Sequence, residues 1–101
     1  MNNTVYVTNF TGHEYTNAEQ YGELVYLTKG FVSFDNLNSI KSRVSEFIKQ
    51  ANNEDYLLLS GNNLICALAT NLWLNYHTQC KILHWNGLKR EYGLHILTNE
   101  N

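Results

Sequence analysis

One stretch of sequence decides the fold of this chain: YLLLSGNNLICALATNLWLNYH, residues 56–77. Its first four residues form an apolar run between polar segments, which is typical of a central parallel strand covered on both faces. Ser60-Gly61 then turns the chain, and Asn62 or Asn63 is placed to cap a helix that runs to about His77. The stretch therefore predicts a buried strand that leads through a tight turn into an apolar helix.

A strand and a hairpin follow this helix. Cys80 to Trp85 reads as the next strand, and Asn86-Gly87 favours a type I′ turn, whose two central residues both need positive φ. The side chains of the last strand alternate between its two faces. One face carries Leu88, Arg90, Tyr92, Leu94 and Ile96. Residues 56–85 thus form a right-handed βαβ unit, and the last strand returns antiparallel to it.

The N-terminal part of the chain adds two strands joined by a short helical turn. Thr4 to Asn9 and Leu24 to Thr28 are rich in β-branched and aromatic residues, which fit a half-buried pleated surface. Between them, Thr16 and Glu19 have the spacing of a capping box, in which each side chain satisfies a free backbone N–H of the other residue. We therefore expect a single helical turn that ends near Gly22.

An amphipathic helix is predicted from Asp35 onward, where the apolar period changes from two to 3.6. Asp35 or Ser33 is the expected cap, because both side chains accept hydrogen bonds from a first helical turn. Polar residues occupy the outer face. One stripe should be buried against the sheet, formed by Leu37, Ile40, Val44, Phe47, Ile48 and Ala51.

These elements predict a single small α/β domain over residues 1–97, followed by a polar tail at 98–101. The order β-β-α-β-α-β-β favours a mixed, mostly parallel sheet of about five strands, with two main helices and a C-terminal β-hairpin. The order of the strands is left open; parallel pairing of the strand at 4–9 with the strand at 56–59 would bring the ends of both strands to one edge of the sheet.

Composition limits the classes of function. The chain has 101 residues and a net charge of −2, so it lacks the basic face that duplex nucleic-acid binding requires. No apolar run is long enough to span a membrane and the first residues do not resemble a signal peptide, so we expect a cytoplasmic protein. Cys66 and Cys80 stand in no paired motif and are expected to be free core thiols.

A candidate binding site lies where the parallel strands end, because ligands of open α/β sheets gather beyond those ends. The free N–H groups of the second helix and the absent side chain of Gly61 suit a phosphate or carboxylate. The alternative is that the turn only caps the helix. Arg90 lies either at the sheet edge or over a bound anion. The candidate ligand-binding residues are Ser60, Gly61, Asn62, Asn63, Arg90 and His13.

Two further groups of residues have side chains suited to catalysis or metal binding. His13 beside Glu14 is a candidate general base, and the alternative is an exposed polar loop. His77, Cys80 and His84 have a metal-like spacing, but they straddle a helix end, a loop and a strand and lack a fourth ligand. The sequence therefore predicts no metal site, no cofactor and no catalytic residue.

The helix at 62–77 is apolar on most of its sides. Such a helix must be covered on all sides, and the sheet of so small a domain covers one of them. We therefore expect a homo-oligomer in which this helix meets a second subunit.

Two segments, YLLLSGN at 56–62 and KILHWNGLKREY at 81–92, resemble small uncharacterised proteins carried by bacteriophages and mobile elements. The resemblance covers about half of the chain. It implies a setting of host takeover or evasion of host defence, in which compact oligomeric proteins bind a host protein or sequester a nucleotide signal. It implies no catalytic residues.

The leading hypothesis is a non-enzymatic oligomeric binding protein, phage-encoded and active in the host cytoplasm, that binds a nucleotide-like anionic ligand or a host protein. The alternative is a small hydrolase or transferase that uses His13 and Glu14 near the Ser60-Gly61-Asn62 turn. A third hypothesis is a structural or inhibitory protein whose aromatic surface docks onto a host enzyme.

Overall fold

The computed structural model describes residues 3–99. Residues 1–2 and 100–101, which include the end of the predicted polar tail, lie outside the described part. Eight elements follow one another along the chain: β1 (Thr4–Val7), η1 (Thr16–Tyr21), β2 (Glu23–Tyr26), α1 (Leu37–Gln50), β3 (Tyr56–Leu58), α2 (Asn63–Tyr76), β4 (Gln79–Asn86) and β5 (Glu91–Thr98). Of the helices within residues 3–99, none is both long and apolar enough to cross a membrane.

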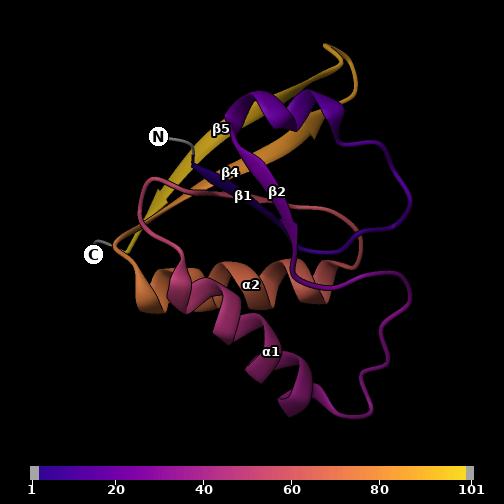
Figure 1. Ribbon diagram of the computed structural model, residues 1–101, viewed down its shortest axis with the longest axis vertical. Coiled ribbons are helices and arrows are strands. Elements are labelled where there is room, and N and C mark those ends of the chain that lie inside the picture. Colours follow the sequence, from indigo (N-terminus) through magenta and orange to yellow (C-terminus); the bar gives the residue numbers. More distant parts are fainter. Residues whose placement is uncertain (1–2, 100–101) are drawn as a thin grey trace.

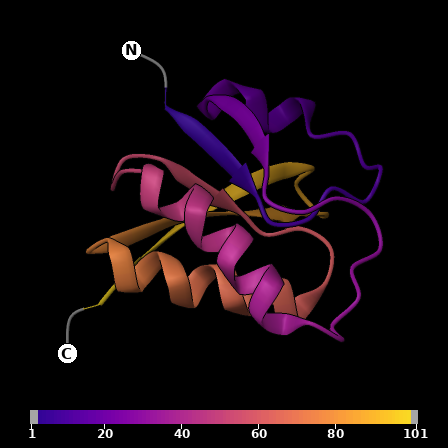
Figure 2. The ribbon, with the colours of Figure 1, turned by 60° about the horizontal axis from the view of Figure 1, so that its bottom comes forward.

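The five strands form one mixed sheet in the order β2-β1-β3-β4-β5. The first four are parallel and β5 is antiparallel to β4, which confirms the predicted α/β fold with its C-terminal hairpin. Strand β1 lies beside β3, a pairing that the sequence left open, with Val5 opposite Tyr56. The long helices α1 and α2 cover one face of the sheet, and the short 3₁₀ helix η1 lies over the other (Figures 1 and 2).

Strand β3 is apolar on both sides because it is covered on both sides. Leu57 packs in the core under α1 and α2, and Leu58 packs in a second core under η1; both side chains are almost fully buried. Period-two alternation makes neighbouring residues of a strand point to opposite faces. The continuous run LLL of the sequence therefore reflects a strand with no solvent-exposed face.

Helix α2 begins as predicted. The Oδ1 atom of Asn62 accepts hydrogen bonds from the backbone N–H groups of Leu64 and Ile65, at 2.8 and 3.4 Å. The helix packs against the sheet and α1 and buries Ile65, Ala69, Leu72 and Trp73. Leu64 and Tyr76 are the large apolar side chains that it leaves exposed among the described residues. The homo-oligomer through this helix stays a prediction.

Both predicted caps in the first half of the chain are wrong. Helix α1 is capped by Asn36, whose Oδ1 accepts from the N–H of Ser39, because Ser33 is engaged upstream with the N–H of Asp35. The capping box at the start of η1 does not form, since the hydroxyl of Thr16 donates to Glu14 instead. Tyr15 is the residue at the cap position of η1, so Thr16 lies inside the first turn.

The predicted type I′ turn is also wrong. Asn86 pairs with Glu91, so the hairpin loop has the four residues Gly87–Arg90 between them. The Oδ1 atom of Asn86 accepts from the N–H groups of Leu88 and Lys89, at 3.1 Å each, and this side chain closes the longer loop. Positive φ occurs at Arg90, with a value of 54°. Arg90 is therefore an exposed loop residue and does not lie in phase with the apolar side of β5.

Candidate functional site

The candidate site lies at the edge of the sheet where β1 and β3 end side by side. After β1 the chain leaves toward η1 on one face, and after β3 it leaves toward α2 on the opposite face. The chain continues from β1 to β2 on one side of the sheet and from β3 to β4 on the other, so strand order reverses between β1 and β3. Open α/β sheets form the crevice for their ligands at such a point. The Ser60-Gly61 turn lies at this point, as the sequence predicts.

The turn is tightly built around Gly61. Its φ is +79°, in the left-handed region that favours glycine, and a Cβ atom added there would lie 2.8 Å from the Cβ of Asn9. Asn9 is almost fully buried, and its Oδ1 is the buried side-chain polar atom without a hydrogen-bond partner among the described residues. The loops after β1 and β3 thus touch each other directly.

Thr8 fixes the backbone of Ser60. The hydroxyl of Thr8 donates to the carbonyl oxygen of Ser60 at 2.7 Å and accepts from its N–H at 2.8 Å. The hydroxyl of Thr28 in turn donates to the carbonyl oxygen of Thr8 at 2.8 Å. Thr8 is fully buried, so its hydroxyl and carbonyl groups are shielded from water. Both backbone groups of Ser60 are therefore engaged, and its hydroxyl is the polar group left to face other partners.

That hydroxyl contacts Tyr15, which the sequence did not single out as a site residue. The Oγ of Ser60 lies 2.7 Å from the hydroxyl oxygen of Tyr15. The same tyrosine hydroxyl donates to the carbonyl oxygen of Asn9 at 3.3 Å and accepts from the N–H of Thr11 at 3.5 Å. Tyr15 therefore joins the loop after β1 to the turn after β3.

A cavity of about 420 Å³ opens beside this hydrogen-bonded group. Trp85 at the end of β4 and Tyr92 at the start of β5 form part of its lining, with ring centroids 5.0 Å apart in an edge-to-face arrangement. Burial raises the pKa of Tyr92, as does the nearby Tyr15. The lining consists of His13, Glu14, Tyr15, Asn17, Leu58, Leu59, Ser60, Gly61, Trp85 and Tyr92.

The structure brings three of the six predicted binding residues to this cavity: Ser60, Gly61 and His13. Asn62 lies in a neighbouring open hollow and its side chain caps α2, while Asn63 is exposed in the first turn of the helix. Arg90 is not part of the lining. Tyr15, Trp85 and Tyr92 also line the cavity and were not among the predicted binding residues; Trp85 and Tyr92 lie at the two strand ends that flank the hairpin loop.

Two of the residues with metal-like spacing, His77 and Cys80, have ordinary structural surroundings. The Nε2 atom of His77 lies 2.8 Å from the carbonyl oxygen of Ile48, at the end of α1. Cys80 is fully buried in the core under the helices, and burial raises the pKa of its thiol to about 12. A neutral, buried thiol is a small core residue rather than a reactive one.

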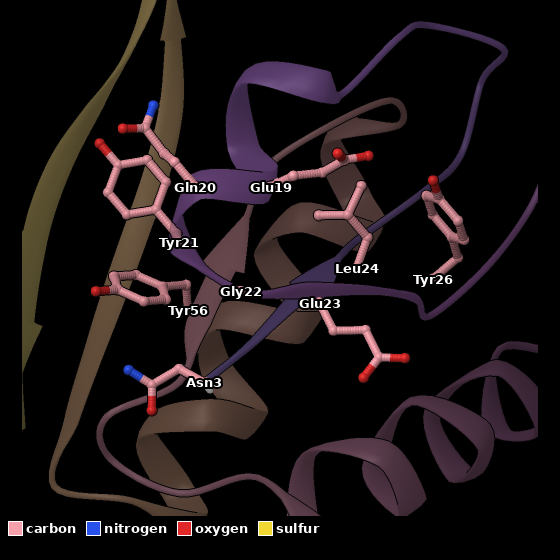
Figure 3. A pocket seen from close by; sticks show the side chains of 9 residues that line it. All are labelled: Asn3, Glu19, Gln20, Tyr21, Gly22, Glu23, Leu24, Tyr26 and Tyr56. Atoms are coloured by element: carbon pink, nitrogen blue, oxygen red, sulfur yellow. The ribbon is translucent and has the colours of Figure 1, made fainter. Parts of the chain in front are cut away.

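A larger hollow of about 910 Å³ lies along β2, at the opposite end of η1. Figure 3 shows its lining on both sides of Gly22, with the rings of Tyr21 and Tyr56 on one side and Leu24 and Tyr26 on the other. The two rings contact each other, with centroids 5.2 Å apart. This hollow is wider and more open than the cavity at Ser60, and its side chains spread along a strand edge instead of converging on one point.

Comparison with known proteins gives one match. The model of a family described as phage Pam3 gp32-like protein matches residues 3–98 of the chain. No curated protein and no solved structure matches it. The match spans nearly all of the chain and confirms the resemblance to phage proteins that residues 56–62 and 81–92 suggest.

Proposed function

The chain belongs to the phage Pam3 gp32-like family, and from this premise we propose that it is a phage-encoded binding protein that holds a small ligand beside Ser60 and Trp85. One observation carries the proposal: a cavity of about 420 Å³ lies where strand order reverses, with aromatic and polar side chains around it. This volume is in the range of small-molecule sites, roughly 300–1,000 Å³, and such sites prefer this place in α/β sheets. The protein would act in the cytoplasm of the infected host.

The contacts at the cavity support binding over catalysis. His13 and Glu14 line it together with Ser60, as the hydrolase or transferase alternative requires. However, the hydroxyl of Ser60 is paired with Tyr15, and the carboxylate of Glu14 accepts from the hydroxyl of Thr16 at 2.9 Å. A nucleophilic serine needs a base at hydrogen-bond distance, and its present partner is a phenol. The arrangement favours holding a ligand in place.

The proposal is tested in two steps. Native mass spectrometry of the protein purified without denaturation detects a co-purified small molecule. Calorimetric titration then measures binding of adenosine, guanosine, cytidine and uridine and of their 5′-monophosphates. Trp85→Ala should weaken binding about tenfold or more, because stacking of a ring on an aromatic side chain contributes roughly 1–3 kcal/mol.

Leu88→Ala is the matched control for this variant. Leu88 lies in the same hairpin, is almost fully exposed and does not line the cavity. It should leave binding unchanged. A bound molecule or a saturable heat that Trp85→Ala removes supports the proposal. If no bound molecule is found and none of the eight compounds gives a binding signal, the proposal is overturned.

A further inference from the structure

The hydroxyl of Tyr15 has a single proton and three polar neighbours. The N–H of Thr11 donates to it, so the proton goes either to the carbonyl oxygen of Asn9, at 3.3 Å, or to the Oγ of Ser60, at 2.7 Å. The two oxygen atoms differ in what else is available to them. The serine hydroxyl carries a proton of its own, whereas a carbonyl oxygen can only accept.

The surroundings of Asn9 decide between these directions. Asn9 is 3% exposed, so water does not reach its backbone readily. Its carbonyl oxygen receives a hydrogen bond from Tyr15 at 3.3 Å. If Tyr15 donated to Ser60 instead, that carbonyl would be buried without a donor, which costs the full desolvation of the group. Tyr15 therefore donates to Asn9, and Ser60 donates to Tyr15.

This assignment leaves the side chain of Ser60 with no proton to offer. Its N–H and carbonyl are held by Thr8, and its hydroxyl proton is held by Tyr15. What Ser60 presents to the cavity is an oxygen that accepts. A phosphate or carboxylate, which also accepts, would meet this oxygen without a hydrogen bond between them.

The rest of the site agrees with a ligand that donates. Glu14 contributes a carboxylate to the lining, and the lining contains no lysine or arginine. Asn62 already occupies the N–H groups of Leu64 and Ile65 at the start of α2, where an anion would otherwise be held. The rings of Trp85 and Tyr92 provide apolar surface against which a flat molecule packs.

We propose that the ligand is an uncharged heteroaromatic ring with an exocyclic amino group, as in adenosine, guanosine or cytidine, whose N–H donates to the Oγ of Ser60 while the ring packs against Trp85. This inference rests on the proposed function and specifies its ligand. It replaces the nucleotide-like anion expected from the sequence with a nucleoside that lacks phosphate. Ser60 then selects ligands that carry a hydrogen-bond donor over ligands that lack one.

The test compares each nucleoside with the analogue that lacks its amino group. Calorimetry measures adenosine against purine riboside, guanosine against inosine, and cytidine against the 2-pyrimidinone riboside. One amino compound should bind about tenfold tighter than its analogue and than its own 5′-monophosphate, the value expected for one hydrogen bond to a buried acceptor. This comparison uses the wild-type protein and needs no variant.

Ser60→Ala then assigns the preference to its residue. The variant should bind both members of the pair with similar affinity, while Ser60→Thr, which keeps the hydroxyl, should retain the preference. Circular dichroism and the urea midpoint verify that both variants are folded. Equal binding of the pair, or tighter binding of a 5′-monophosphate, overturns this inference and leaves the proposed function standing, provided that Trp85→Ala still weakens binding. If no compound gives a binding signal and no molecule co-purifies, both this inference and the proposed function are overturned.

Discussion

Replacing Gly61 with alanine should destabilise the protein more than the same replacement at Gly12. Both glycines have positive φ, +79° and +89°, so an added side chain is strained at either position. They differ in the space around them. A Cβ at Gly61 would lie 2.8 Å from the Cβ of Asn9 and 3.0 Å from the Cγ2 of Thr11, whereas a Cβ at Gly12 would meet nothing within 4 Å.

The expected magnitudes follow from these two terms. A non-glycine residue in the left-handed region costs about 1–2 kcal/mol, part of which is offset because alanine also restricts the unfolded chain. Gly12→Ala should therefore lose about 1 kcal/mol. At Gly61 the overlap with Asn9 and Thr11 adds roughly 1–3 kcal/mol, as for other overpacked sites. Gly61→Ala should lose about 2–4 kcal/mol in total.

Urea denaturation followed by circular dichroism measures both variants and wild type under the same conditions. The slope of the free energy with urea should stay unchanged, and the midpoint should fall further for Gly61→Ala. Gly30→Ala is a second control, because Gly30 has a φ of +66° and no atom within 4 Å of an added Cβ. Equal losses at Gly61 and Gly12 would refute the close approach of the loops after β1 and β3.

Three further predictions concern stability. Asn62→Ala should cost about 1 kcal/mol in urea denaturation because it removes the α2 cap, whereas Asn63→Ala should stay within about 0.5 kcal/mol of wild type. Thr8→Val should cost about 2–4 kcal/mol, since both backbone groups of Ser60 lose their partner, and a loss below about 0.5 kcal/mol would contradict that contact. Burial raises the pKa of Cys80 from its ordinary value of 9.0 to about 12, so the unfolded chain releases this proton first and stability should fall as pH rises from 9 to 12. Cys80→Ala should flatten this decline, and an unchanged slope would count against the burial of the thiol.

Local patterns were sufficient for the central part of the fold. The apolar run of β3, the turn at Ser60 and the apolar helix were predicted because each depends on residues close in sequence. The right-handed crossover and the hairpin then predicted how β3, β4 and β5 run relative to one another, whereas the order of all five strands was left open. The predicted strand at Thr4–Asn9 is present, although it ends at Val7, and its pairing with β3 was not predicted.

The errors arise where several side chains compete for the same backbone group. Asn36, Asp35 and Ser33 are all good helix caps; the helix begins after Asn36, whose side chain accepts from the N–H of Ser39, while the Ser33 side chain accepts from the N–H of Asp35. At the hairpin, the Asn86 side chain captures two loop N–H groups and makes a four-residue loop possible. Positive φ then falls on Arg90, where the sequence gives no glycine signal.

Only part of the candidate site could be predicted from the sequence. Ser60 and Gly61 follow a recognisable strand, so the rule that ligands gather beyond strand ends identifies them. Trp85 and Tyr92 reach the cavity because β4 and β5 pair in a register that places these two residues opposite each other. That register depends on the length of the hairpin loop, which the Asn86-Gly87 pattern predicted incorrectly. An error of two residues in a turn thus concealed two residues of the site.

The contacts of Ser60 show why a Ser-Gly motif alone does not fix the polarity of a site. A serine and a glycine before a helix favour an anion, because hydroxyl and backbone N–H groups are donors. In the assignment that we propose, Tyr15, 45 residues away in sequence, accepts the serine proton because its own proton goes to the buried carbonyl of Asn9. The polarity of the site is therefore set by a backbone carbonyl that never faces the ligand. Without a buried tyrosine hydroxyl beside it, the same Ser-Gly turn would keep its serine hydroxyl as a donor. It would then suit a ligand that accepts hydrogen bonds, such as a phosphate or a carboxylate.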